Sequence, residues 1–430
     1  MHIVKNASKV RKIKKSYKIT LTTFILTVAI LTLLPSYCNH CGYLTNFVIA
    51  SATPTTSIVP TGQMGVCAKV VRYGKNNNCA IKNIFVDEKF EDDTLIVPGS
   101  IKIQTENGKT LTYKVIKVLL LTPSDITENF ICPKEKIKRL KICAPIKQLG
   151  AYCCCDFEYL QEVELPNSLT FLGQNCFCNC QSLTKINIPN SLKVLPSSCF
   201  KGCTSLSEVP LLNSIKILGD FCFQDCSDLK NVTIENSVTE MGTCCFDNCF
   251  NIVHVDISDN VKKIGDYCFR ACYSLKRVNI SNSIKELNWG IFMNCENIEN
   301  IKIPDLVEKL GSNCFKGCIN LKNITLPNSV VRLGSDCFNG CDNLESVIFS
   351  NSVTEIEFGC FENCRSLTAV VLPKSFTRLG KRCFGKCSNL TSIVVLSCNI
   401  WVDEEVFLGC QSLQNLSSKL SVKNVLQTHL

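Results

Sequence analysis

A phenylalanine recurs every 23 residues through the C-terminal half of this 430-residue chain, and this spacing constrains the fold more than any other feature. A leucine or isoleucine follows each phenylalanine by six residues, and an apolar pair such as Ile324 and Leu326 follows by nine and eleven. A strict repeat without insertions is typical of a solenoid, whose neighbouring coils stack because no coil buries its apolar face alone. The repeating residues are Phe177, Phe200, Phe223, Phe246, Phe269, Phe292, Phe315, Phe338, Phe361, Phe384 and Phe407.

Each repeat is expected to contain one short strand and one tight turn. The alternation at nine and eleven residues after the phenylalanine is the period-two pattern of a strand with one buried face. Pro-Asn-Ser, as at 327–329, ends the strand because proline cannot donate to a ladder. The stretch from Leu333-Gly334 to the next phenylalanine has room for about one helical or 3₁₀ turn. The pattern therefore predicts a repeat solenoid with a parallel β-sheet on one face and short helical or 3₁₀ turns on the other.

The repeat frame extends upstream of the phenylalanines. Cys153-Cys154 and Leu160 occupy the Cys-Phe and Leu positions, and Leu140 and Leu149-Gly150 fit one coil earlier. Degenerate terminal repeats are typical of caps, so we expect about 13 coils, two of them degenerate. The predicted solenoid covers 128–420, a β-rich N-terminal cap covers 67–127, a linker covers 35–66, and a C-terminal tail covers 421–430.

The N-terminus carries a targeting signal. Residues 1–18 hold seven lysines and arginines and no acid, and the apolar segment 19–34 follows. This order predicts a signal anchor or a cleaved secretory signal, with residues 1–18 in the cytoplasm and the rest across the membrane. The net charge of +9 leaves +2 for the rest of the chain, so a nucleic-acid partner is not expected.

The repeat motif is similar to that of a known family. Cys/Ala-Phe-x-x-Cys, then Leu-x-x-Ile-x-Ile-Pro-x-Ser-Val, then Ile-Gly, resembles the BspA-like (Treponema pallidum-type) leucine-rich repeat family, and residues 95–118 resemble the lead-in of such proteins. The resemblance implies a leucine-rich-repeat fold with its parallel β-sheet on the concave face. It also implies a surface-exposed, non-enzymatic protein that binds host or matrix proteins. This chain departs from the family by placing cysteine, not alanine, before most of the phenylalanines.

The cysteines have three interpretations. Nine coils carry Cys-Phe-x-x-Cys, but Ile291 and Val406 replace the first cysteine in two others, so that position is expected to be a core slot for packed thiols. Disulfide ladders within or between coils are the alternative in an oxidising compartment. Zinc is disfavoured by the three-residue gaps, and we expect no metal and no cofactor. Cys38 and Cys41 are interpreted as juxtamembrane thiols, with a local or partner-chain disulfide or half a metal site as alternatives.

Positions eight and ten residues after each phenylalanine are expected to point outward from the concave sheet. In the last three of the strands that follow the phenylalanines, apolar residues occupy the second of these positions and would form an exposed stripe about 10 Å long. Exposed apolar clusters with a polar rim mark binding sites, although ordinary β-propensity is the alternative. The predicted protein-binding residues are Ile348, Val371 and Val394, flanked by Thr325, Ser346 and Ser392.

The same sheet carries a His-x-Asp pair and several glycosylation sequons. His254 lies two residues before Asp256, but no nucleophile is evidently placed beside them, so no catalytic role is expected. Asn-x-Ser/Thr sequons predict a glycoprotein if the chain enters a pathway that glycosylates. The predicted sites are Asn231, Asn279, Asn323, Asn389 and Asn415.

Together these features predict a cell-surface or secreted leucine-rich-repeat protein that mediates protein–protein recognition or adhesion through its concave sheet. Its expected partners are other proteins (surface, host or matrix proteins), and the membrane through residues 19–34. The alternative is a non-enzymatic intracellular or membrane-associated scaffold without a specific ligand. A cysteine-dependent oxidoreductase would need one thiol of abnormal reactivity, and the sequence distinguishes none, so we expect no enzyme.

Overall fold

The computed structural model describes residues 56–63, 66–73, 78–86, 92–104, 109–118, 137–143, 145–208, 213–413 and 415–418. The predicted cytoplasmic segment 1–18, the apolar segment 19–34, the Cys38/Cys41 pair and the tail 421–430 lie outside the described residues. Within the described part, no helix has the length and apolar character needed to span a membrane.

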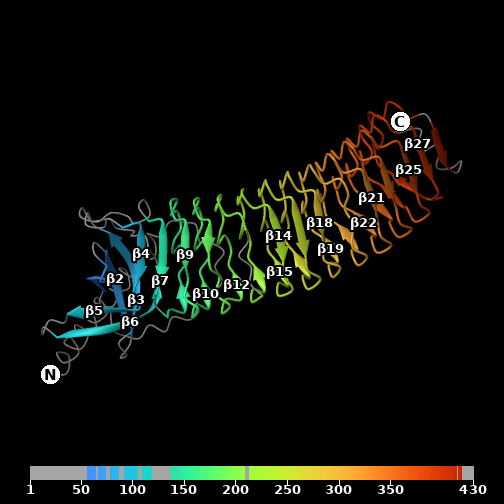
Figure 1. Ribbon diagram of the computed structural model, residues 1–430. Helices are drawn as coiled ribbons and strands as arrows, with labels where there is room; N and C mark the ends of the chain where they lie inside the picture. Colours follow the sequence, from blue (N-terminus) through green and yellow to red (C-terminus); the bar gives the residue numbers. More distant parts are fainter. Residues whose placement is uncertain are drawn as a thin grey trace, which may run out of the picture. The chain divides into compact units, whose positions relative to one another are not determined.

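The chain begins with a β-rich segment that continues directly into the repeats. β1 (Thr56–Pro60), β2 (Val66–Tyr73) and β3 (Asn78–Val86) pair antiparallel in that order, and β5 (Ser100–Gln104) pairs antiparallel with β6 (Thr110–Val118). β6 is parallel to β3 and to β8, while β4 (Thr94–Val97) is parallel to β7. Through these last two pairings the segment covers the open end of the first coil (Figure 1).

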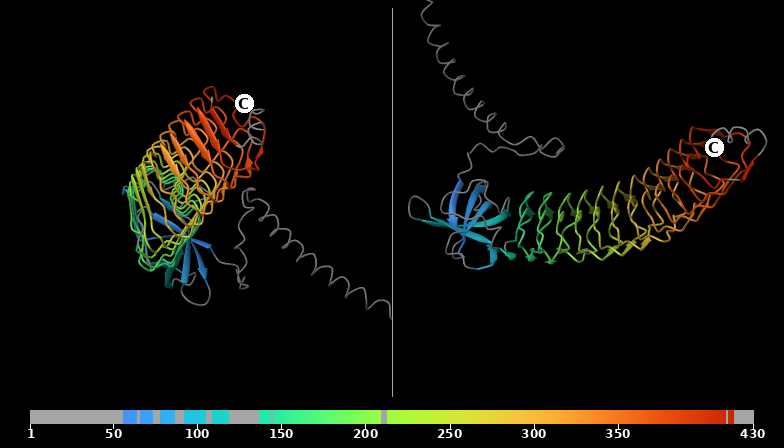
Figure 2. Two further views of the ribbon diagram at one scale, coloured as in Figure 1. Left: turned by 90° about the vertical axis from the view of Figure 1, so that its right-hand side faces the viewer. Right: turned by 90° about the horizontal axis from the view of Figure 1, so that it is seen from above.

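The predicted repeat solenoid with its 23-residue period is confirmed, and Figure 2 shows its coils in chain order from green to red. Neighbouring strands pair in parallel with a constant offset of 23 residues, as in Val232↔Val255↔Val278. We call the outward surface of one ladder, whose strands are two to four residues long, the strand face. These strands are β7 (Arg139–Ile142), β9 (Glu162–Glu164), β11 (Lys185–Ile186), β14 (Asn231–Ile234), β16 (His254–Ile257), β18 (Arg277–Asn279), β21 (Asn323–Thr325), β23 (Ser346–Ile348), β25 (Ala369–Leu372), β27 (Ser392–Val395) and β29 (Asn415–Ser418).

A second ladder of two-residue strands, which the sequence analysis did not predict, runs along another side of the coils. Each of its strands has one outward and one buried residue. Two residues are too few to show the period of two that identifies a strand in a sequence. The strands of this ladder are β8 (Gln148–Leu149), β10 (Phe171–Leu172), β12 (Val194–Leu195), β13 (Ile217–Leu218), β15 (Glu240–Met241), β17 (Lys263–Ile264), β19 (Glu286–Leu287), β20 (Lys309–Leu310), β22 (Arg332–Leu333), β24 (Glu355–Ile356), β26 (Arg378–Leu379) and β28 (Trp401–Val402).

The third side of each coil differs from the expected helical or 3₁₀ turn: the described residues form consecutive turns and no helix. In each coil one residue two positions before the phenylalanine and one two positions after it have left-handed backbone, as at Asn313 (φ 58°) and Gly317 (φ 73°) around Phe315. A right-handed helix cannot continue through such residues. The backbone N–H groups bond to the next coil instead, as from Phe315 to the carbonyl oxygen of Cys337 at 2.8 Å.

A column of stacked phenylalanine rings fills the core along the solenoid axis. The rings from Phe177 to Phe407 are at most 1 % exposed, and successive ring centroids lie between 5.2 and 6.1 Å apart with interplanar angles up to 16°. Each ring therefore packs against the same residue of the coil before and after it. A residue inserted into or deleted from one coil would move its ring out of this column, which accounts for the invariant spacing.

The two cysteines of each Cys-Phe-x-x-Cys coil have different environments, and in the described part of the chain they form no disulfide. The first is fully buried among apolar side chains, as are Ile291 and Val406 in the same slot. The thiol of the second donates to the backbone carbonyl oxygen of the phenylalanine one coil earlier, as from Cys318 Sγ to the carbonyl oxygen of Phe292 at 3.2 Å. This bond recurs from Cys180 to Cys410, so the second slot carries a hydrogen bond that Ile or Val would lose.

Candidate functional site

The strand face is a long, regular surface on which every second residue points outward. The buried and exposed positions of β14 and β25 alternate as expected, with Val232 and Val370 inside and Asn231 and Val371 outside. Ion pairs between neighbouring coils cover part of it, including Lys185 with Glu162 at 2.6 Å. Such exposed pairs contribute little to stability, so this face is free to serve recognition.

The structure places the predicted apolar stripe on three neighbouring strands of this face. Ile348 is 59 % exposed and Val371 is 53 % exposed, whereas Val394 is half-buried. Val371 is the ladder partner of Val394, and Ile348 is the partner of Thr325 on the upstream side. The stripe therefore begins beside a hydroxyl group and crosses β23, β25 and β27.

The sheet is interrupted inside this stripe. β21 and β23 form a two-stranded sheet and β25, β27 and β29 form a three-stranded one, with no ladder pairing between β23 and β25. Phe349 occupies the inward position here, where the flanking coils have Leu326 and Leu372. Its ring packs edge-on against Phe361 and Phe376, with centroids 5.8 and 5.3 Å away. The larger ring coincides with the interruption between Ile348 and Val371.

Polar groups border the stripe at its upstream end. Ser346 Oγ donates to Asn323 Oδ1 at 2.6 Å, and Thr325 is exposed beside them. Ser392 is half-buried on β27 at the other side. The six residues predicted from the sequence thus lie on β21, β23, β25 and β27, with the polar members at or beside the ends of the apolar ones.

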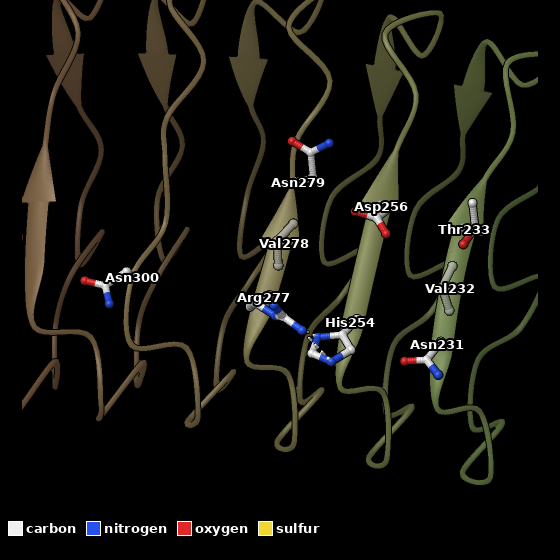
Figure 3. A pocket seen from close by; sticks show the side chains of 9 residues that line it. All are labelled: Asn231, Val232, Thr233, His254, Asp256, Arg277, Val278, Asn279 and Asn300. Atoms are coloured by element: carbon white, nitrogen blue, oxygen red, sulfur yellow. Dashed lines mark hydrogen bonds between the residues drawn. The ribbon is translucent and has the colours of Figure 1, made fainter.

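A polar hollow of about 660 Å³ lies further upstream on the same face (Figure 3). Arg277 and His254 face one another across β16 and β18, and Arg277 Nε donates to His254 Nδ1 at 3.3 Å. Asp256 pairs in register with Asn279 at the other end of the hollow. The lining is Asn231, Val232, Thr233, His254, Asp256, Arg277, Val278, Asn279 and Asn300.

The lining of the hollow suits binding of a polar group. It offers a guanidinium, a carboxylate and three amides, and among the described residues no serine or cysteine lines it as a nucleophile. The sequence pattern singled out His254 with Asp256 but did not predict the contact of His254 with Arg277. The sequence did indicate that these side chains are neighbours, because His254, Arg277 and Asn300 occupy the same position in successive coils.

The sequon asparagines are distributed over this surface. Asn231 and Asn279 line the hollow, and exposed Asn323 borders the apolar stripe. Asn389 is exposed on a turn, and Asn415 begins β29. Glycans on the first two would cover the hollow but leave Val371 accessible.

The cysteines do not form a metal centre in the described part of the chain, where no three His, Cys, Asp or Glu side chains are grouped to hold an ion. Burial raises the pKa of most second-slot thiols, including that of Cys318, well above its ordinary value. Thiols of this kind are poor nucleophiles because the reactive form is the thiolate.

Comparison with known proteins identifies a family for the repeats and solved structures of similar fold. The family described as BspA type leucine rich repeat region (6 copies) matches residues 125–216, 196–322 and 308–428. Comparison with curated protein sequences found no match.

Three solved structures have a similar fold. A leucine-rich repeat protein from Bacteroides ovatus is 20 % identical, with 83 % of this chain and 94 % of that one covered at a TM-score of 0.55. A leucine rich cell surface protein from Faecalibacterium prausnitzii is also 20 % identical, with 87 % and 98 % covered at 0.55. The pneumococcal vaccine antigen PcpA is 17 % identical, with 88 % and 97 % covered at 0.52.

Proposed function

Because this chain belongs to the BspA-type leucine-rich repeat family, we propose that it is a cell-surface or secreted protein that recognises other proteins through its strand face. The surface location is supported by two proteins of similar fold, one named as a cell surface protein and one as a vaccine antigen. The proposed role is adhesion or recognition and requires no cofactor.

The observation that carries the proposal is the exposure of Ile348 and Val371 on a face that is otherwise polar over most of its length. Covering a branched apolar side chain that is about half exposed would contribute on the order of 1 kcal/mol each. Interfaces concentrate their energy in a few such central residues surrounded by polar groups that exclude water. Thr325 and the Ser346–Asn323 pair are placed to form part of that rim.

The experiment is a charge substitution in the stripe. Val371→Asp is expected to weaken binding to immobilised extracellular-matrix proteins at least tenfold, because a carboxylate would be buried at the contact. Val331→Asp is the matched control, since Val331 is 46 % exposed on a different side of the coil. Circular dichroism and the unfolding midpoint would verify that both variants fold. Equal binding by the two variants would overturn the strand face as the recognition surface.

We also propose that residues 19–34 bring the solenoid across a membrane, as a signal anchor or a cleaved signal. If so, Asn231, Asn279, Asn323 and Asn389 are available to a glycosylation pathway where the host cell has one. Intact mass of the protein from its own cell, before and after deglycosylation and thiol alkylation, measures signal cleavage, glycans and free thiols together. A chain with only free thiols and no glycan would favour the intracellular scaffold instead.

A further inference from the structure

Five lysines form a basic line along a side of the solenoid other than the strand face. Each lies seven residues before the phenylalanine position of its coil, directly before a strand of the second ladder, and all five are exposed. Thr170 and Thr239 fill the intervening coils, so the line contains no acidic residue. We call this set the lysine column: Lys147, Lys193, Lys216, Lys262 and Lys285.

The members of the lysine column are stacked in register. The backbone N–H of Lys216 donates to the carbonyl oxygen of Lys193 at 2.7 Å, and that of Thr239 donates to Lys216 at 2.8 Å. With neighbouring strands about 4.8 Å apart, seven coils place the first and last lysine about 29 Å apart. The charges therefore follow one straight line at the spacing of the coils.

From Lys147 onward, the first acidic residue in this line is Glu308, one coil beyond Lys285. None of the five lysines forms an ion pair with any residue that the structure describes, whereas Arg332 and Glu355 pair at 2.8 Å on the same ladder. The adjoining column alternates Glu240, Lys263, Glu286 and Lys309 and so balances its own charge. Like charges on neighbouring strands are destabilising, and Lys193 over Lys216 is such a pair. The lysine column therefore places like charges in adjacent coils, whereas the adjoining column alternates charges of opposite sign.

An exposed apolar column runs beside the first half of the lysine column. Phe171 is 53 % exposed, Val194 is 41 % exposed and Ile217 is 36 % exposed, and Val194 and Ile217 are ladder partners. Each follows a residue of the basic line directly in the chain. A partner lying along this side would therefore meet cations on one flank and an apolar strip on the other.

We infer that the lysine column binds a linear anionic polysaccharide, with sulfate or carboxylate groups on the lysines and the C–H face of the sugar rings on Phe171, Val194 and Ile217. A pyranose unit is close in length to the coil spacing, so successive anionic groups can meet successive coils. An extended acidic peptide repeats on one face at roughly 6.7 Å, which does not match. Single-stranded nucleic acid is held by a series of aromatic platforms, and the apolar column offers one, Phe171. This inference concerns a different surface and partner from the strand face and stands or fails separately.

The test measures binding of the full chain in non-ionic detergent to immobilised heparin as the sulfated polysaccharide. The variant K147Q/K193Q/K216Q is compared with K141Q/K185Q/K322Q, which removes the same charge from ion-paired lysines on or directly beside the strand face. Residues 1–18 are basic but identical in both, so the difference reports the lysine column. We expect the first variant to bind at least tenfold more weakly and the control to bind within about twofold of the parent.

The salt dependence gives a second readout. Each lysine that releases a counterion contributes roughly one unit to the slope of log Kd against log salt, so the first variant should lose about two to three units. Equal losses in both variants would overturn the inference, because net charge alone would explain them. Tighter binding of the parent to polyglutamate, oligo(dA) or phosphatidylserine vesicles than to heparin would also overturn it. Exposed Lys→Gln changes leave the core intact, and circular dichroism verifies this.

Discussion

The two cysteines of one coil should differ in how much stability the chain loses when each is replaced by valine. Cys314 occupies the first slot of its coil and Cys318 the second, and both are fully buried. The chain itself places Ile291 and Val406 in the first slot. We therefore predict that Cys314→Val is tolerated and that Cys318→Val is destabilising.

The magnitudes follow from the contacts. An apolar exchange in the first slot should change the free energy of unfolding by less than about 1.5 kcal/mol. In the second slot valine removes the bond from Cys318 Sγ to the Phe292 carbonyl, worth about 0.5–1 kcal/mol. It also adds a branched carbon to a tight turn, which costs about 1–3 kcal/mol more. The Phe292 carbonyl still accepts from the backbone N–H of Cys295 at 3.1 Å, so no buried acceptor is left without a partner. The total loss is therefore about 1.5–4 kcal/mol.

The assay is urea unfolding followed by circular dichroism, with a reducing agent present so that thiol oxidation does not contribute. Cys318→Ser serves as the matched control because a hydroxyl retains the donor. It should recover part of the loss seen with valine. If Cys314→Val costs as much as Cys318→Val, the thiol hydrogen bond does not explain why the second slot is always cysteine in this chain, and the reasoning is wrong.

Further predictions concern a buried carboxylate, alkaline stability and the aromatic column. Asp247 is fully buried and accepts two hydrogen bonds from Arg270, which is partly exposed. Arg270→Met leaves the buried carboxylate without its cation, so it should lower the free energy of unfolding more than Asp247→Ala does, by roughly 3 kcal/mol against roughly 2. Thermal or urea unfolding measures this difference. Burial raises the pKa of the Cys79 and Cys244 thiols from 9.0 to about 11, so their stabilising effect is complete below pH 9 and is lost as the pH rises to about 11. Urea midpoints at pH 8 and 10.5 should show this fall, and it should be smaller in the Cys79→Ala/Cys244→Ala variant. Phe292→Ala removes a ring stacked on both sides and should destabilise the chain by about 3–5 kcal/mol; a loss below 1 kcal/mol would contradict the stacked core.

The outward positions of the strand face were accessible to sequence reasoning because most of the strands there are three or four residues long. Ile348, Val371 and Val394 were predicted to share a face from the period of two and the repeat of 23, and the structure places them on one face. Their unequal exposure was not predictable. Val394 is half-buried while Val371 is exposed, and such a difference depends on the neighbouring coils, not on the pattern within one.

The helical or 3₁₀ turn expected on the turn side of the coil was wrong for a different reason. Its length allowed a helical turn, and local propensity offers no reason for Phe221 or Tyr267 to adopt left-handed backbone. They do so because the amide groups of this segment bond to the next coil, which fixes their direction. Backbone strain of this kind is maintained by the surrounding stack and has no signature in a single repeat.

The sequence by itself determined the solenoid, its period and its core, because eleven copies of the phenylalanine repeat display which positions must be apolar and which vary. It also determined that the first cysteine slot is a core position, since isoleucine and valine stand there in two coils. Only the tertiary structure decided that a second ladder exists, that the second cysteine carries a hydrogen bond, and that five lysines of one line form no ion pair with any described residue. The physical reason is that these features arise between residues 23 or more positions apart, whose proximity is created by stacking and is invisible within any one coil.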